Sequence, residues 1–247
     1  KNDQKICRLF YMHYRKVEVE KMVSNDKRIR IITGHYGSGK TEFAVNYVTA
    51  LREQTEGKVA IADLDIVNVY FRSREKKEEL EEKGIMVIAS NIEGAGADVP
   101  AVSGAMTMPV TNKEFQYVVD LGGNDVGTLV LGRMKPLLHP EETDFFMVVN
   151  TYRPNTSTPE GVIEQMENLE YASGLKVTGF INNTNLVRET TAQCLVEGDA
   201  ILREVTKRTG VPVKYVTYVE ELLTEGVPKG LAGELFPMKF NMRKTWM

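Results

Sequence analysis

The sequence predicts an α/β fold of three layers, in which helices cover both faces of a mostly parallel central sheet. Strand and helix patterns alternate along most of the chain, which is typical of a parallel sheet built from βαβ units. The strand segments are continuous apolar runs, as expected when both faces of a sheet are buried. A glycine-rich loop also follows the first strand directly and leads into a segment with helical spacing of apolar residues.

The composition is that of a soluble globular protein, with 247 residues of which 42% are hydrophobic and 26% charged. A chain of this length can bury the core of one α/β domain. The 31 basic and 34 acidic residues give a net charge of −3, so we expect no strong attraction to nucleic acid. No apolar run approaches the ~18 residues of a membrane span, and the opening residues lack the apolar core of a secretory signal.

Cysteine usage favours a reduced, cytoplasmic setting. The two cysteines, Cys7 and Cys194, match no metal-binding spacing and cannot form a disulfide framework. Residues 1–27 are rich in charge and show no clean strand pattern. They are either a genuine N-terminal extension or sequence upstream of an internal start, and we assign them no function. A single α/β domain is expected over residues 28–247.

The expected elements can be placed in order. Strands are expected at 28–33, 58–65, 85–90, 115–123, 144–150, 176–183 and 211–218, of which 211–218 is the last. Helices are expected at 40–54, 70–84, around 127–138, 159–173 and 190–209. The 70–84 segment has acid–base pairs three and four residues apart and ends in glycine, which is typical of an exposed helix. The Gly/Ala-rich 93–106 segment leads to no clear helix, and we interpret it as a mobile loop.

The glycine-rich loop matches a phosphate-binding motif. Residues 34–41, GHYGSGKT, fit the pattern G-x-x-x-x-G-K-[ST]. Its glycines allow a tight turn whose N–H groups point at an anion, and the helix that begins there adds its positive end. Lys40 supplies a charge for the β- and γ-phosphates and is a candidate catalytic residue, while the Thr41 hydroxyl is a candidate magnesium ligand. The expected nucleotide-binding residues are Gly34, His35, Tyr36, Gly37, Ser38, Gly39, Lys40, Thr41, Glu42, Asn182 and Asn183.

Acidic residues end two later strands. Asp63 and Asp65 are separated by one residue at the end of a strand, so in a regular strand their side chains point to the same side of the chain. One of them can approach the magnesium ion while the other faces the attacking water. Asp120 ends an apolar run, a position suited to holding magnesium through water. Gly122 and Gly123 behind it permit a backbone change that senses the γ-phosphate.

This ordered set of motifs resembles the SIMIBI class of P-loop proteins, which includes the MinD/ParA ATPases, the CobQ/CobB-type synthetases and the nickel-insertion GTPases. The segments GHYGSGKTE, DLDIVNVYFRSRE, DLGGNDVG, NTYRPNTSTPEG and TGFINNTN more closely resemble the CobQ/CobB/MinD/ParA nucleotide-binding-domain family. The likeness spans about residues 28–218 and implies a P-loop NTPase fold that binds nucleotide. Carried over, Asp65 positions or activates the attacking water, and Asp63 and Asp120 assist Mg²⁺.

Two positions depart from these families. ATPases of the ParA kind have a lysine after the first loop glycine, which reaches phosphate across a dimer interface, whereas this chain has His35. A neutral imidazole brings no fixed charge, which argues against the face-to-face dimer, and a homodimer stays an open alternative. In the nickel-insertion GTPases the motif N-K-x-D ends in an acid that binds guanine, and Asn185 stands at that position here. An asparagine offers one acceptor and one donor side, which favours adenine and makes Asn182 and Asn183 candidate base contacts.

We therefore predict a protein that binds ATP and Mg²⁺ and hydrolyses ATP to switch a conformation or an unidentified protein partner. One alternative is an ATP-dependent ligase of the CobB or dethiobiotin-synthetase kind that acts on a small carboxylate. Arg72, Arg74, Arg153 and the 93–106 segment are candidate contacts for such a second substrate or for a partner. Another alternative is a GTP-driven metal-insertion chaperone, against which stand Asn185 and the absence of a Cys/His cluster in the sequence. A nucleotide sensor that does not hydrolyse also stays open.

Overall fold

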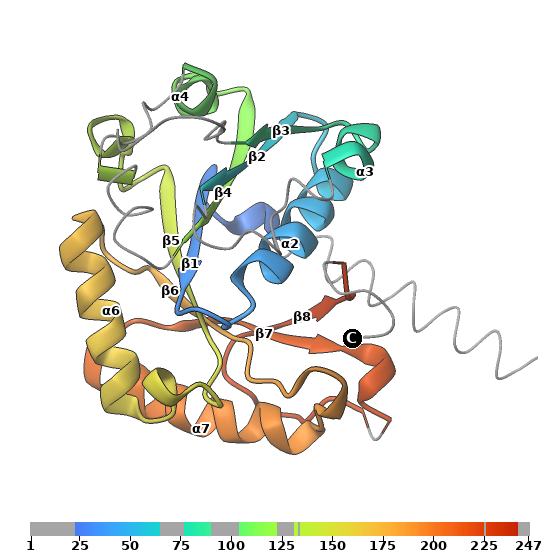
Figure 1. Cartoon of the computed structure of the whole chain (residues 1–247), viewed down its shortest axis with the longest axis vertical. Helices are drawn as coiled ribbons and strands as arrows, with labels where there is room; N and C mark the ends of the chain where they lie inside the picture. The colour runs from blue at the N-terminus through green and yellow to red at the C-terminus, as the bar shows by residue number, and fades with distance from the viewer. Residues whose placement is uncertain are drawn as a thin grey trace, which may run out of the picture.

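The computed structural model describes residues 23–64, 77–89, 104–122, 131–132, 134–224 and 226–241. Its centre is an eight-stranded sheet in the order β3-β2-β4-β1-β5-β6-β7-β8, with helices on both faces (Figure 1). The strands are β1 (Ile29–Gly34), β2 (Lys58–Leu64), β3 (Ile85–Ala89), β4 (Phe115–Leu121), β5 (Thr143–Val149), β6 (Gly179–Asn182), β7 (Val213–Val219) and β8 (Glu234–Met238). Every neighbouring pair in this sheet is parallel. The predicted three-layer α/β fold is confirmed.

The helices connect successive strands. The α-helices are α2 (Lys40–Gln54), α3 (Lys77–Glu82), α4 (Gly104–Thr111), α6 (Pro159–Ser173) and α7 (Ala192–Thr209). Short 3-10 turns are η1 (Val23–Asn25), η3 (Lys135–Leu137), η4 (Pro154–Thr156), η5 (Val187–Glu189) and η6 (Glu220–Leu222). Both α6 and α7 end at a glycine with positive φ, Gly174 and Gly210, which is the usual way to close a helix because glycine meets no Cβ clash there.

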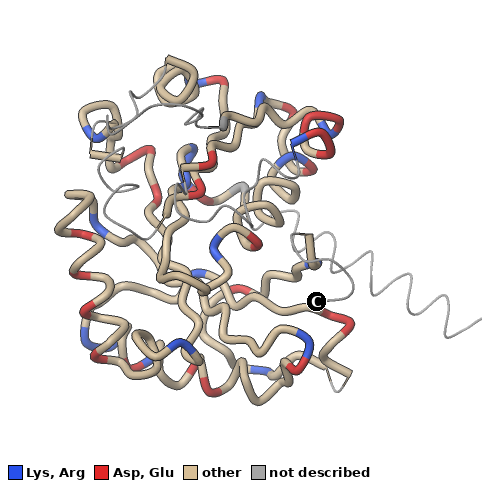
Figure 2. Tube along the Cα trace, in the orientation of Figure 1, with Lys and Arg blue, Asp and Glu red and all other residues tan. Residues whose placement is uncertain are grey.

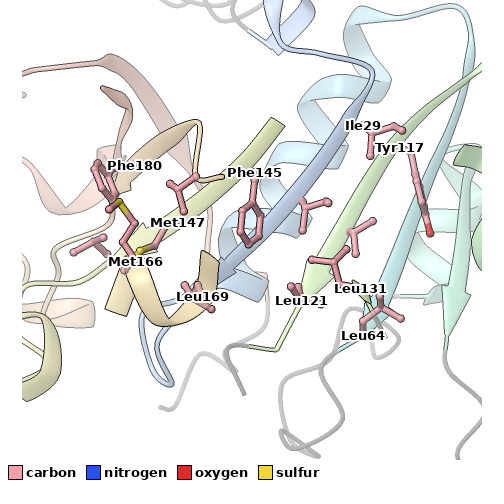
Figure 3. Close-up of a cluster of buried hydrophobic side chains, with 14 of the residues drawn as sticks. Ile29, Leu64, Tyr117, Leu121, Leu131, Phe145, Met147, Met166, Leu169 and Phe180 are labelled. Carbon is pink, nitrogen blue, oxygen red and sulfur yellow. The ribbon is translucent and has the colours of Figure 1, made fainter. Parts of the chain in front are cut away.

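Two apolar clusters cover the two faces of the sheet. One cluster joins the strands to α4, α6 and α7, and Figure 3 shows part of it, with Met147 and Met166 beside Phe180. The other joins the strands to α2, α3 and η1. Consecutive strand residues such as Ile31 and Ile32 belong to different clusters, as the alternation of side chains along a strand requires. Burial on both faces explains why these strands are apolar throughout.

Several elements differ from the sequence prediction. Strand β7 is not the last, since β8 pairs beside it at the edge of the sheet (Figure 1). Pro237 interrupts the β8 pattern, and proline is accepted in edge strands because one side of them makes no ladder. The expectation that the 93–106 segment leads to no clear helix is wrong, since helix α4 begins at Gly104 within it, although Pro109 lies inside this helix. Residues 90–103 lie outside the described residues, so the expectation of a mobile loop there is not addressed.

The exposed helix that was predicted at 70–84 is described only in its second half. Helix α3 is rich in glutamate (Figure 2) and has the expected ion pairs, Lys77 with Glu81 and Lys83 with Glu79. Arg72 and Arg74 fall outside the described residues. Of the helix expected around 127–138, residues 131, 132 and 134 are helical and η3 follows.

Residues 23–27 of the expected N-terminal extension pack onto the domain. Val23 is buried in the cluster beneath α2. The Asp26 carboxylate accepts hydrogen bonds from Tyr47 and Tyr215 and pairs with Lys214 at 2.8 Å. This contact holds η1 against α2 and β7. Among the described residues, no helix is long and apolar enough to cross a membrane.

Candidate functional site

The loop between β1 and α2 has the backbone form of an anion-binding turn. Gly37 and Gly39 have φ values of 75° and 88°, in the left-handed region that favours glycine. Ser38 N donates to the His35 carbonyl at 3.0 Å, which closes the turn. Lys40 begins α2 directly after Gly39. The first N–H groups of a helix have no partner within the helix and carry its positive end, so they can bind an anion at this point.

Two glycines of the loop are required by close packing. A Cβ atom at Gly34 would lie 2.4 Å from the carbonyl oxygen of Val148 on β5. A Cβ atom at Gly39 would lie 2.3 Å from Nδ2 of Asn183. Real Cβ atoms do not approach other atoms this closely, so any other residue at either position would displace the loop from its neighbours.

Side chains from the loops after β5 and β6 donate hydrogen bonds to the backbone of the phosphate loop (residues 34–41). Arg153 Nε donates to the Gly37 carbonyl at 3.0 Å, and Asn183 Nδ2 donates to the Ser38 carbonyl at 2.7 Å. Asn183 Oδ1 also accepts from Thr217 Oγ1 on β7 at 2.6 Å. Three strand ends therefore support the loop. Arg153 was a candidate contact for a second substrate, and here its Nε donates to the phosphate loop.

His35 is engaged on both of its ring nitrogens. Its Nε2 lies 2.9 Å from the side-chain amide of Asn155, and its Nδ1 lies 3.0 Å from the carbonyl of Tyr36. With the amide nitrogen as donor, Nε2 must accept and Nδ1 must carry the hydrogen, which assigns the neutral Nδ1–H tautomer from its hydrogen bonds. His35 thus connects the phosphate loop to η4, and the neighbouring Tyr36 is 69% exposed.

The acids at the ends of β2 and β4 lie side by side. Asp63 is the register partner of Asp120, and Asp120 is also opposite Ile32 on β1. Both carboxylates are buried, at 3% and 0% exposure. Lys40 and Thr41, at 5% and 6% exposure, begin α2 at the same edge of the sheet. Ligands of open α/β sheets bind at this edge, beyond the carboxyl ends of the strands.

The donor chemistry of this edge fits Mg²⁺. Carboxylate and hydroxyl oxygens are the ligands that Mg²⁺ prefers, and it often keeps several waters. Asp63, Asp120 and Thr41 supply such oxygens. Within the described ranges, no three His, Cys, Asp or Glu side chains gather as a complete protein-only metal site. Asp65 and Gly123 lie outside the described residues, so the roles predicted for them stay predictions.

A recess that is open to solvent lies beside the phosphate loop. It is bounded by the loop and α2, by the segments after β6 and β7, and by the end of β8. The lining residues are Gly39, Glu42, Asn183, Thr184, Asn185, Val187, Thr190, Thr217, Tyr218, Val219, Leu222, Met238 and Phe240. Its apolar side is formed by aliphatic and aromatic side chains, as is usual for small-molecule sites.

The asparagines after β6 have different surroundings. Asn183 and Asn185 line the recess, whereas Asn182 does not. The Asn182 amide donates to the Leu195 carbonyl on α7 at 3.3 Å and accepts from Thr184 N at 3.2 Å. Asn185 donates to the Asn183 carbonyl at 2.6 Å and accepts from Val187 N at 3.1 Å. All three side-chain amides therefore bind backbone groups of the protein. A base contact by the side chain of Asn182 or Asn183 stays a prediction.

The far wall of the recess was missed by sequence reasoning. The lining residues of this wall come from the end of β7, from η6, from β8 and from the segment after β8; they are Val219, Leu222, Met238 and Phe240. The apolar residues of the segment GELFPMKF were the sequence pattern that could have predicted β8. The proline within this segment argues against a strand, so the strand was not predicted. Val187, on the same rim, has φ 58°, which is a strained conformation for a β-branched residue and is found preferentially at functional sites.

Comparison with solved structures supports the fold. The chain is similar to FtsY from Mycoplasma mycoides, with 17% identity over 82% of this chain and 68% of that chain and a TM-score of 0.53. It is also similar to the signal recognition particle receptor FtsY from Elizabethkingia anophelis, with 15% identity over 84% and 64% of the two chains and a TM-score of 0.50. For FtsY from Thermotoga maritima the identity is 18% over 87% and 70%, with a TM-score of 0.49.

At these identities the likeness concerns the fold. The chain shares the parallel α/β fold of these FtsY structures. No protein-family model and no curated protein matches the sequence.

Proposed function

We propose that the chain binds Mg²⁺-ATP at the edge formed by β1, β2 and β4 and hydrolyses it to switch a conformation or a protein partner. One arrangement carries the proposal. The turn of the phosphate loop leads into α2, where Lys40 and Thr41 are buried, at the sheet edge at which Asp63 and Asp120 pair in register. A glycine turn that matched the motif by chance would not need these acids on the neighbouring strands.

Each residue has a distinct task in this proposal. The backbone N–H groups from Gly37 to Thr41 hold the phosphates, and the Lys40 ammonium places its charge on the β- and γ-phosphates. Thr41, Asp63 and Asp120 would hold Mg²⁺, directly or through water, and bound Mg²⁺ neutralises the phosphate charge. Asp65, two residues beyond Asp63 in the sequence, would orient the attacking water.

In this proposal the recess holds the nucleotide base, and its residues favour adenine over guanine. It opens at Gly39, the last residue before α2, so a triphosphate on the loop can extend its nucleoside there. At the position of the guanine-binding acid stands Asn185, whose amide is committed to the backbone at Asn183 and Val187. Guanine presents two adjacent donors, and Asn185 offers them no carboxylate.

Phosphate release tests hydrolysis and separates the alternatives. The proposal expects release from Mg²⁺-ATP by the chain alone, or after addition of a protein partner, in the absence of any small carboxylate. Release that strictly requires an added small carboxylate, with a phosphorylated or ligated product, would overturn the switch and support the CobB-like ligase. Binding without release under both conditions would reduce the proposal to a nucleotide sensor.

A further inference from the structure

One wall of the recess belongs to the end of the described chain. Met238 is the last residue of β8, and Phe240 lies two residues beyond it. The ladder between β7 and β8 ends at the pair Val219 and Met238. Residues 239–241 therefore extend past the sheet, and a different contact must hold Phe240 at the recess.

That contact comes from helix α2. The Asn46 side chain binds both backbone groups of Lys239: its Oδ1 accepts from Lys239 N at 2.9 Å, and its Nδ2 donates to Lys239 O at 3.0 Å. One turn earlier on the helix, Glu42 Oε1 accepts from Asn241 N at 2.5 Å. The amide of Asn46 thus pairs with Lys239 as a neighbouring strand would, across 193 residues of sequence.

The two helix residues hold the segment on either side of Phe240. Glu42 and Asn46 are four residues apart and so lie on one face of α2. They bind residues 239 and 241, which flank Phe240. The same helix begins with Lys40 and Thr41 of the phosphate loop, so one rigid element carries the phosphate site and fixes the opposite wall of the recess.

We propose that Asn46 is a positioning residue for the nucleotide base. By holding Lys239 it places Phe240, with Met238, where a purine ring bound in the recess packs against them. The inference rests on the proposed function, because it assigns a wall of the same site. Its physical basis is preorganisation: a wall already fixed loses less conformational freedom when the base binds.

The test compares Mg²⁺-ATP with Mg²⁺-tripolyphosphate, which carries the phosphates without a base. Asn46→Ala is expected to weaken ATP binding about three- to tenfold, the effect of one to two hydrogen bonds. Tripolyphosphate binding should change less than about twofold, since the phosphate loop is untouched. The matched control is Thr49→Ala on the same helix, whose hydroxyl donates only to the Val45 carbonyl of α2 among the described residues, and which should leave both affinities unchanged.

A double-mutant cycle shows whether Asn46 acts through Phe240. If it does, Asn46→Ala adds no further loss of ATP affinity to Phe240→Ala, because the positioned ring is already gone. Equal losses for ATP and tripolyphosphate, or fully additive losses in the double variant, would overturn the inference and leave nucleotide binding intact. Absence of ATP binding by the unsubstituted chain would overturn the proposed function and this inference with it.

Discussion

The side-chain amide of Asn183 donates a 2.7 Å hydrogen bond to the backbone carbonyl of Ser38, 145 residues earlier in the chain. Asn183 also accepts from Thr217 at 2.6 Å, so one buried side chain joins the phosphate loop to the ends of β6 and β7. This link connects the loop to the recess that we assign to the base.

Asn183→Ala should both destabilise the protein and weaken ATP binding. Loss of buried hydrogen-bond partners costs about 1–3 kcal/mol, which lowers the melting temperature by about 2–4 °C per kcal/mol for a chain of this size. The displaced loop should lower ATP affinity by about tenfold in a calorimetric titration. The control is Ser173→Ala, which removes a buried hydroxyl that binds Leu169 and Leu175 instead of the loop.

The control should lose stability and keep its ATP affinity. If the Asn183 variant binds ATP as the unsubstituted protein does, the link does not support the site. Equal losses of ATP affinity in both variants would show that affinity follows stability and not this link.

Lys40→Ala should lower the affinity for Mg²⁺-ATP at least about tenfold. The substitution removes a charge from the β- and γ-phosphates, and hydrogen bonds to charged groups contribute about 1.5–3 kcal/mol. Lys58→Ala is a control with the same change of charge, since Lys58 is exposed at the opposite end of β2 and pairs with exposed Glu114. Unchanged binding in a folded Lys40 variant would refute the assignment of the phosphate loop.

Asp65→Ala should slow phosphate release about 10²-fold or more while ATP still binds, because a positioned acid or base contributes on this scale. Single-turnover release and equilibrium binding should be measured on the same preparation. Asp63→Ala is the comparison, since this buried partner of Asp120 is assigned to Mg²⁺ and its loss should weaken binding itself. Unchanged turnover in the Asp65→Ala variant would contradict this role. Equal losses of ATP binding and of turnover would indicate that Asp65 is a Mg²⁺ ligand instead.

Stability should decline in alkali because tyrosines are buried. Burial raises the pKa of Tyr117, whose hydroxyl donates to the Met106 carbonyl at 3.1 Å. A tyrosine ionises near pH 10 once unfolded, so its contribution is complete below that pH and is lost as the pH rises above it. The loss is about 1.4 kcal/mol per pH unit for each such tyrosine.

Denaturant unfolding of the protein and of Tyr117→Phe between pH 8 and about 11 measures this effect. The variant should be less stable by about 1 kcal/mol at pH 8, near the start of this range, because its hydrogen bond is lost. Above pH 10 its stability should fall less steeply, so that the two curves converge. Parallel curves would show that Tyr117 ionises equally in the folded and unfolded chains.

Most of the fold and the polar half of the site follow from local sequence. Strands buried on both faces are continuous apolar runs, so β1 to β7 were recognisable. Because parallel strands end at one edge, the placement of Asp63, Asp120 and the phosphate loop together could be inferred before any coordinates. The two elements that were not predicted, β8 and α4, also have a local cause. Pro237 lies within β8 and Pro109 within α4, and proline normally argues against a strand or a helix.

The remaining features depend on contacts between distant segments. Nothing near Asn46 indicates that its amide pairs with Lys239, and nothing near Asn183 indicates Ser38 as its partner. Asparagine side chains can bind many backbone groups, so their partners are decided by tertiary packing. The sequence therefore predicted which strand ends form the site, but not which amides hold the phosphate loop or what forms the far wall of the recess.

The most direct test of nucleotide binding and of the base assignment is a thermal melt of the protein with Mg²⁺ and matched concentrations of ATP or GTP. ATP at 100 times its dissociation constant should stabilise the fold by about 2.7 kcal/mol. At about 2–4 °C per kcal/mol, this is a shift of several degrees, and GTP should give a smaller one because Asn185 leaves a guanine donor unpaired. A larger shift with GTP would contradict the base assignment, and no shift with either nucleotide would contradict the central claim that this site binds nucleotide.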